Sequence, residues 1–280
     1  MSHALKLFNT PAGWIVESAT GTRTTVAPPE TGTLTARDDL YAYLTSQLAS
    51  GRAAPADALS TLLAPVERQE VWAAGVTYFR SRTARMEESK ASSGGSFYDL
   101  VYNAERPELF AKAAAWRVIA PGGTVRIRKD AKWNVPEPEF TLVLSSTGRI
   151  TGYTIGNDMS SRDIEGANPL YLPQAKVYDG SCAIGPAILV TEAPLPATSA
   201  ISIEIVRGGQ SVFTGTTTVS EMKRDFETLA AYLYRELTFP DGALLLTGTG
   251  VIPPDEFTLQ SGDDIRITVE QIGTLQNTVA

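Results

Sequence analysis

The sequence predicts an α+β protein that is mostly β: a β-sandwich or roll preceded by a small N-terminal domain. Hydrophobic residues make up 43% of the 280 residues, which is enough for a buried core. After residue 70, short apolar runs rich in β-branched residues alternate with Gly and Pro turns, as strands of such folds do. The runs are Val71–Val76, Val125–Arg128, Phe140–Leu144, Ile150–Ile155, Ala187–Val190, Ile201–Val206, Ala243–Leu246 and Ile265–Ile272.

The first 65 residues have a different pattern and are predicted to form the small domain. Strand-like pieces at residues 6–8, 13–17 and 24–26 precede a helical pattern over Asp38–Ser50, where leucines and a tyrosine recur at helical spacing. A loop rich in Ala, Gly and Pro follows it. We therefore expect a small domain at residues 1–65 and the main domain at residues 66–280.

Two helices are expected within the main domain, at Glu105–Ala115 and Met222–Glu236. The second has an apolar stripe at positions i, i+3, i+4 and i+7, the spacing of one helix face. The stripe consists of Phe226, Leu229, Ala230 and Leu233.

Composition excludes several classes of function. The net charge of −7 opposes nucleic-acid binding, which depends on clustered Lys and Arg. No signal peptide is recognisable and no apolar stretch approaches the ~20 residues that span a bilayer, so we expect no membrane partner. The single cysteine, Cys182, suits a cytoplasmic protein. Because His3 is the sole histidine and lies at the N-terminus, a Ser-His-Asp triad or a histidine zinc site is excluded.

Two carboxylates open the strand that includes Phe140. In an extended chain alternate side chains point to one face, so Glu137 and Glu139 of the NVPEPEF segment project together. Two adjacent carboxylates repel each other unless a cation lies between them. Taken alone, the pair also fits an exposed strand face with two solvated glutamates.

A third carboxylate strengthens the case for a metal. The strand at residues 152–155 ends in a polar turn, and a hairpin would return Asp158 to the glutamate pair. Three carboxylates make an all-oxygen site, which favours Mg²⁺, with Mn²⁺ or Ca²⁺ as alternatives, and disfavours zinc. Three protein ligands leave positions for water and substrate.

Three further segments carry candidate substrate-binding groups. Lys176 lies in an expected turn between strands, where it is either a solvated lysine or a cation beside the metal. Gly248, Thr249 and Gly250 follow an apolar strand and form either a tight turn or a backbone anion site. The basic stretch Arg80–Arg85 is either a solvated face or, through Arg80 and Arg82, a carboxylate clamp.

From about Val71 onwards the chain resembles the fumarylacetoacetate hydrolase family. The resemblance rests on the Glu137-x-Glu139 pair, the segment Asn157–Asp163, Lys176 before a Gly-Pro turn, and the late Thr247–Gly250. It covers roughly three-quarters of the chain. It implies a mixed β-sandwich roll, a catalytic domain at residues 66–280, Mg²⁺ on the three carboxylates and a homodimer or homotetramer.

Within that family the chain resembles the dehydratases of 2-keto-3-deoxy sugar acids more than the hydrolases. Family hydrolases pair a histidine with a glutamate to activate water, whereas residues 78–88 contain arginines and no histidine. The likeness implies dehydration of a 2-keto-3-deoxy-pentonate, such as the D-arabinonate, to 2,5-dioxopentanoate in pentose catabolism. The substrate would bind through Arg80, Ser81, Arg82 and Thr249, with Lys176 holding negative charge.

The acid/base must then be a residue other than histidine. Glu108, in the expected helix at RPELF, is the first candidate, with Glu87 and Glu88 behind it, although a glutamate is also an ordinary residue at a helix N-terminus. Two other functions stay open. One is hydrolysis or decarboxylation of an acylpyruvate or related diketo acid with the same metal, and the other is non-catalytic binding of a small molecule.

Overall fold

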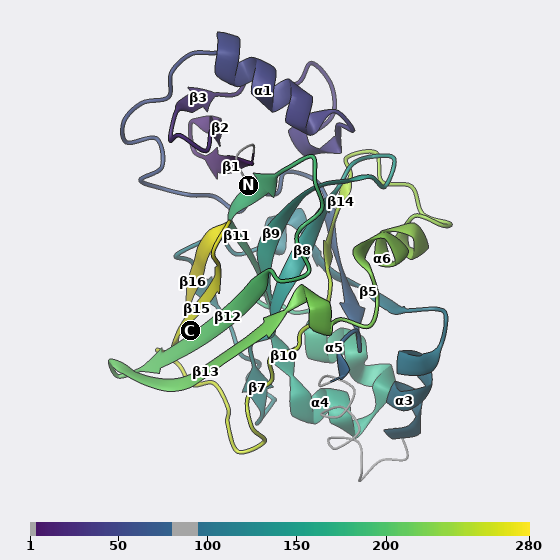
Figure 1. Cartoon of the computed structure of the whole chain (residues 1–280). Coiled ribbons are helices and arrows are strands. Elements are labelled where there is room, and N and C mark those ends of the chain that lie inside the picture. The colour runs from purple at the N-terminus through teal and green to yellow at the C-terminus, as the bar shows by residue number, and fades with distance from the viewer. Residues whose placement is uncertain (1–3, 80–94) are drawn as a thin grey trace.

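Two large β-sheets and one small one form the framework of the protein (Figure 1). The computed structural model describes residues 4–79 and 95–280. The large sheet has nine strands in the order β3-β2-β1-β11-β9-β8-β14-β4-β5, and a second sheet has five in the order β13-β12-β15-β16-β6. Two short strands, β10 and β7, pair separately. The predicted class, mostly β with few helices, is confirmed.

The strands in chain order are β1 Leu5–Thr10, β2 Gly13–Glu17, β3 Arg23–Thr25, β4 Glu70–Gly75, β5 Glu108–Ala114, β6 Thr124–Val125, β7 Asn134–Val135, β8 Pro138–Leu144, β9 Ile150–Asp158, β10 Ser160–Ser161, β11 Cys182–Val190, β12 Ala200–Arg207, β13 Gln210–Thr218, β14 Ala243–Leu246, β15 Asp264–Val269 and β16 Gly273–Val279. The α-helices are α1 Leu40–Ser50, α3 Gly95–Asn103, α4 Arg162–Ala167, α5 Leu172–Lys176 and α6 Phe226–Leu233. Short 3-10 turns lie at Leu34–Ala36, Ala115–Arg117, Pro169–Tyr171 and Val219–Glu221.

The two large sheets enclose one hydrophobic core. Strands β8 and β11 are buried along their whole length, because both faces of the nine-stranded sheet are covered there. Strands β12 and β15 alternate between buried and partly exposed residues and so turn one face inward. Phe140 and Leu245 of the large sheet pack with Ile203 and Ile267 of the smaller one. This sandwich fixes β8 and β9, which carry the site.

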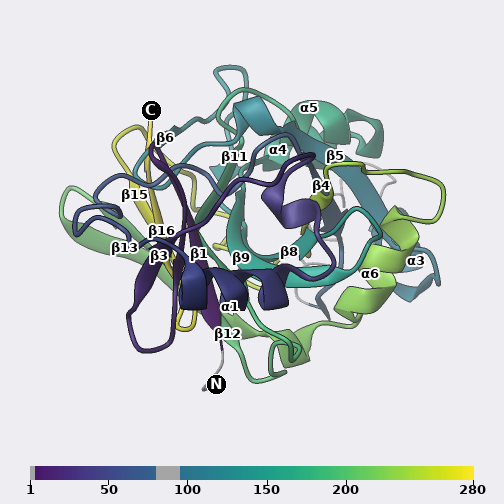
Figure 2. The same cartoon turned by 90° about the horizontal axis from the view of Figure 1, so that it is seen from above.

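The N-terminal residues extend the large sheet rather than forming a sheet of their own. Strand β1 pairs antiparallel with β11, and β2 and β3 continue beyond it. Leu40 and Leu44 of α1 join the same hydrophobic cluster as Val143 and Ile188 of the large sheet. Figure 1 shows α1 and β1–β3 gathered at one end of the molecule, with α3, α4 and α5 towards the other, and Figure 2 looks down on the end that carries α1. The boundary at residues 65 and 66 stays a prediction.

The expected helix at Glu105–Ala115 is wrong. Residues 108–114 form β5, which pairs antiparallel with β4 at the edge of the large sheet. The alanines there favour a helix, but pairing with β4 outweighs that local preference. The expected helix at Met222–Glu236 is confirmed in its centre only, since α6 begins after the N-cap Asp225 and ends at Leu233.

The sequence patterns also missed the short strands β7 and β10 and two long strands of the five-stranded sheet. Strand β13 is rich in Thr and Ser and largely exposed, and β16 alternates buried and exposed residues from Leu275 onwards. Neither contains the apolar run by which the other strands were found. None of the described helices is long and apolar enough to cross a membrane.

Candidate metal and substrate site

The β8–β9 hairpin brings three carboxylates together, as the sequence predicted. Glu139 lies in β8 opposite Gly156, Asp158 ends β9, and Glu137 directly precedes β8. The backbone N–H of Asp158 donates to the Glu137 carbonyl oxygen at 3.0 Å, which fixes the register at the site. One oxygen from each carboxylate lies within 4.8 Å of the others, and all three residues are buried.

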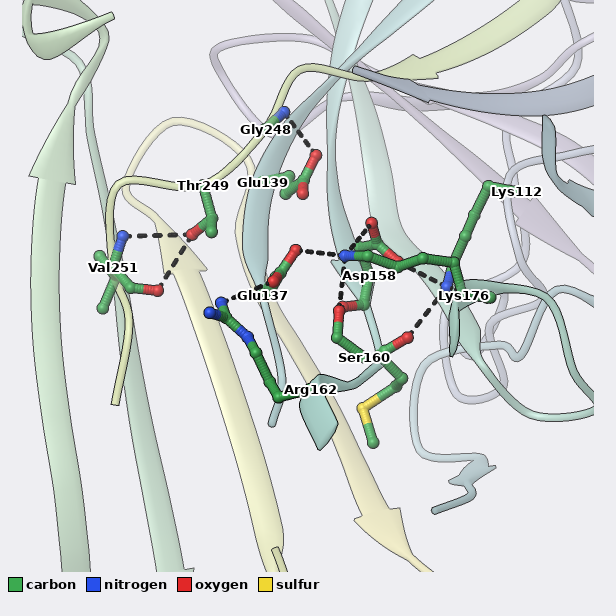
Figure 3. Close-up of polar contacts among 11 residues, drawn as sticks. Lys112, Glu137, Glu139, Asp158, Ser160, Arg162, Lys176, Gly248, Thr249 and Val251 are labelled. Atoms are coloured by element: carbon green, nitrogen blue, oxygen red, sulfur yellow. Dashed lines mark hydrogen bonds and ion pairs between the residues drawn. The ribbon is translucent and has the colours of Figure 1, made fainter. Parts of the chain in front are cut away.

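Basic groups surround these carboxylates (Figure 3). Lys176 Nζ donates to Glu137 Oε2 at 2.6 Å, to Asp158 Oδ2 at 3.0 Å and to Ser160 Oγ at 2.6 Å. Arg162 Nη2 donates to Glu137 Oε1 at 2.8 Å. The expected turn around Lys176 is wrong, because this residue ends helix α5, and its acidic partners come from the distant β8–β9 hairpin.

A second buried lysine, which sequence reasoning missed, reaches Asp158 from the other side. Lys112 Nζ lies 2.5 Å from Asp158 Oδ1 and donates to the Met159 carbonyl oxygen at 3.0 Å and to the carbonyl oxygen of Lys176. It belongs to β5, where the pairing register with β4 shifts and leaves Lys112 without an opposite residue. Such a bulge re-aims a side chain. The signal in the sequence was a lone lysine inside an apolar run, hidden by its assignment to a helix.

The segments at the C-terminal ends of two parallel strands, β4 and β14, form another wall of the site. The backbone N–H of Gly248, two residues beyond β14, donates to Glu139 Oε2 at 2.6 Å. Gly248 has a φ of +90°, and a Cβ there would lie 2.0 Å from the Thr77 hydroxyl, so only glycine fits. Burial, and then the neighbouring Asp158 and Glu137, raise the pKa of Glu139 well above its ordinary value.

A small cavity opens onto the carboxylates. Its walls contain residues from β4, β5, the β8–β9 hairpin, helices α4 and α5, and the segment after β14. The lining residues are Ala74, Gly75, Val76, Phe110, Glu137, Glu139, Asp158, Arg162, Lys176, Gly248 and Thr249.

The structure brings some of the predicted substrate-binding residues to this cavity and leaves others untested. Thr249 lines it, and its hydroxyl is engaged within its own turn, accepting from the Val251 N–H at 3.2 Å. Arg80, Ser81 and Arg82 lie outside the described residues, as do Glu87 and Glu88. Their part in the site stays a prediction.

Glu108 lies at the edge of the cavity, although in a strand rather than in the expected helix. Its carboxylate packs on Gly75, where a Cβ would meet Glu108 Oε2 at 1.9 Å. Gly75 itself lines the cavity. Glu108, Phe110 and Lys112 occupy every second position of β5, and each has a contact at the site: Glu108 with Gly75, Phe110 with the cavity and Lys112 with Asp158.

The side chains present fit a hard divalent cation. The three converging groups offer only oxygen ligands, and no histidine or cysteine belongs to this cluster of described residues. Burial together with like-charge repulsion makes three ionised carboxylates costly without positive charge, as the raised pKa of Glu139 indicates. Three protein ligands also leave coordination positions for a substrate.

The sequence has clear relatives. Residues 98–280 match the family model described as fumarylacetoacetate (FAA) hydrolase C-terminal. A protein of Haloferax volcanii named probable 2-keto-3-deoxyxylonate dehydratase is 49% identical over 216 residues, which cover 77% of this chain and 73% of the relative. The 2-dehydro-3-deoxy-D-arabinonate dehydratase of Saccharolobus solfataricus is 42% identical over 213 residues, covering 75% and 72%.

Solved structures agree with the sequence comparison. The fold is similar to that of 2-keto-3-deoxy-D-arabinonate dehydratase in its apo form, with a TM-score of 0.82 and 32% identity over 99% of this chain and 98% of that one. A structure of the same enzyme complexed with magnesium and 2,5-dioxopentanoate gives a TM-score of 0.81 at the same identity and coverage. With a family model matched over residues 98–280 and a relative 49% identical, this chain belongs to the fumarylacetoacetate hydrolase family.

Proposed function

We propose that the protein is a Mg²⁺-dependent dehydratase that converts a 2-keto-3-deoxy-pentonate, the D-arabinonate or D-xylonate form, to 2,5-dioxopentanoate. The observation that carries the proposal is the buried triad of Glu137, Glu139 and Asp158 beside Lys176, in a chain whose relatives bear dehydratase names. The metal-bound and product-bound neighbour supports both the cation and the product class.

The three carboxylates would hold the cation. When bound, Mg²⁺ supplies a Lewis acid that polarises the 2-keto group and acidifies the C3 protons. Lys176, whose ammonium already bridges Glu137 and Asp158, lies on the cavity wall, where it would stabilise negative charge developing on the C2 oxygen.

We assign proton transfer to Glu108. Its carboxylate lies over Gly75 at the edge of the cavity, where it can face a substrate carbon next to the keto group. One proton leaves C3 and the C4 hydroxyl departs as water, which leaves a C3=C4 double bond. A proton then leaves C5 and one returns to C3, so that the double bond moves to C4=C5, and tautomerisation of this enol with protonation at C4 gives the aldehyde. The carboxylate of the substrate would bind Arg80, Ser81 and Arg82, and Thr249 would contact the substrate from the cavity wall.

The composition of the chain favours dehydration over hydrolysis. Hydrolysis of an acylpyruvate needs an activated water molecule as nucleophile, and the sole histidine of this chain is His3. Dehydration needs no external nucleophile. Proton transfers at C3, C4 and C5 and stabilisation of one oxyanion are sufficient.

The test is a direct comparison of substrates. Purified protein with Mg²⁺ should form 2,5-dioxopentanoate from 2-keto-3-deoxy-D-arabinonate or D-xylonate, and EDTA should abolish this activity. Acylpyruvate and oxaloacetate are the comparison substrates, monitored for cleavage and decarboxylation. Faster turnover of either than of both deoxy sugar acids would replace the proposal with the hydrolase or decarboxylase alternative. Binding of the acids without turnover of any would indicate a non-catalytic protein.

We further propose that the enzyme works in the cytoplasm as a homodimer or homotetramer. The one cysteine, Cys182, is buried and suits a reducing compartment. Two large apolar side chains, Trp116 and Leu170, are exposed on the single chain and are available for contact with a second copy. Light scattering coupled to size-exclusion chromatography measures the assembly, and a monomeric mass would refute it.

A further inference from the structure

The fully buried basic side chains of the described residues all gather at one place. They are Lys112, Arg162 and Lys176, each 1% exposed or less. Buried charges are costly and persist only with partners. Arg162 and Lys176 line the cavity, whereas Lys112 does not. Lys112 therefore contributes charge to the site without contact with whatever the cavity binds.

Lys112 lies beside Asp158 (Figure 3). Its ammonium donates hydrogen bonds to the main-chain carbonyl oxygens of Met159 and Lys176 and forms an ion pair with Asp158 Oδ1. They tie β5 to the two segments that present the aspartate and the second lysine. Asp158 Oδ2 stays on the side of Lys176.

Lys112 also affects the net charge of the site when a metal is bound. Three carboxylates carry one more negative charge than a divalent cation can neutralise, and the substrate that we propose is itself an anion. In a buried site such repulsion is weakly screened. The three carboxylates, a bound divalent cation and the three basic side chains Lys112, Arg162 and Lys176 together carry a net positive charge.

We propose that Lys112 is a specificity-determining residue that acts through Asp158, giving the centre its preference for an anionic 2-keto acid over a neutral ketone. The inference rests on the proposed function, since it requires a metal on the triad. The charge of Lys112 is expected to have opposite effects on binding of the cation and binding of the anion. Removing Lys112 leaves the site more negative, which favours the cation and disfavours the anion.

Isothermal titration calorimetry can measure the two effects separately. The variants are Lys112→Gln, which still has N–H donors but loses the charge, and Lys112→Arg, which keeps the charge. Lys129→Gln, at an exposed lysine, is the matched control. Mg²⁺ alone is titrated into metal-free protein, and pyruvate or its neutral analogue pyruvamide is then titrated into Mg²⁺-loaded protein.

We expect Lys112→Gln to bind Mg²⁺ at least as tightly as the wild type and pyruvate about tenfold more weakly or worse, with pyruvamide unchanged. Lys112→Arg should restore pyruvate binding. Equal weakening of pyruvate and pyruvamide would assign Lys112 a purely structural role, and unchanged pyruvate binding would also overturn the inference.

Two measurements on the wild type distinguish failure of the proposed function from failure of the inference about Lys112. If the wild type binds no Mg²⁺, the proposed function fails at that step, before any variant is compared. If Lys112→Gln does not fold, measurements on the wild type can still overturn the inference. Loaded wild-type protein that binds pyruvamide as tightly as pyruvate has no charge preference for Lys112 to explain, and the inference is then wrong.

Discussion

The carboxylate of Glu108 occupies the space that a side chain on Gly75 would fill. An added Cβ at Gly75 would come within 1.9 Å of Glu108 Oε2, and its three nearest atoms would all belong to that glutamate. The absence of a side chain at one strand end thus creates the place for an acid on the neighbouring strand. Because Gly75 lines the cavity, this contact holds the acid beside the proposed substrate.

Gly75→Ala should therefore lower kcat through displacement of Glu108. The atoms nearest to the new Cβ belong to the end of a flexible side chain, so the melting temperature should change little. A misplaced catalytic group of this kind costs up to about 100-fold in rate. Mg²⁺ affinity should be unchanged. Gly123→Ala is the control, since its Cβ would meet the Ile119 side chain away from the site. Equal kcat in both variants would separate Glu108 from the chemistry.

Glu108→Gln should remove proton transfer itself. Loss of a general acid/base lowers the rate by about 10² to 10⁴-fold. We expect kcat to fall in that range with Mg²⁺ affinity retained, and one limb of the pH profile of kcat to disappear. A variant that keeps both its rate and its pH profile would show that another group transfers the proton.

The three carboxylates should differ in their effect on stability although each is needed for the metal. Asp158→Asn removes the ion-pair partner of Lys112 and leaves Lys176 paired with Glu137, and breaking a buried ion pair costs about 3–5 kcal/mol. Glu139→Gln relieves like-charge repulsion and can still accept from the Gly248 N–H, so metal-free stability should hold or rise. Both variants, and Glu137→Gln, should lose Mg²⁺ affinity and activity. Chemical denaturation and calorimetry without and with Mg²⁺ measure the two effects, and the same stability loss at Asp158 and Glu139 would contradict this ranking.

Much of the fold and the triad could be predicted from the sequence, because both depend on local pattern. Alternation placed Glu137 and Glu139 on one face, and a hairpin brought Asp158 to them. Lys112 could not be found in this way. Its contacts with Asp158 and with the carbonyl oxygen of Lys176 span 46 and 64 residues along the chain and depend on a bulge at a sheet edge. A segment rich in alanine gives no local sign of such pairing. The same limitation hid the position of Glu108, which the pattern assigned to a helix.

Mg²⁺ binding should release a proton, because the pKa of Glu139 is raised. Burial is the first cause, and the charges of Asp158 and Glu137 add to it. A carboxyl whose pKa is raised in the fold contributes most to stability when protonated, below its unfolded pKa. That contribution is lost as the pH rises towards the folded value. The cation needs the ionised form, so Mg²⁺ affinity should fall by up to about tenfold for each pH unit below the raised pKa.

Calorimetric titration of Mg²⁺ in two buffers of different ionisation enthalpy measures the number of protons released. We expect a positive number that decreases as the pH rises, and greater thermal stabilisation by Mg²⁺ at high pH than at low pH. Glu139→Asp is a poor control because it moves the ligand. Glu139→Gln is the better one, since it cannot release a proton and should bind Mg²⁺ weakly at every pH. Proton release of zero across the whole range would mean that Glu139 is already ionised in the metal-free protein. Lys176 and the Gly248 N–H, which both lower the pKa of Glu139, would then outweigh burial and the two neighbouring carboxylates.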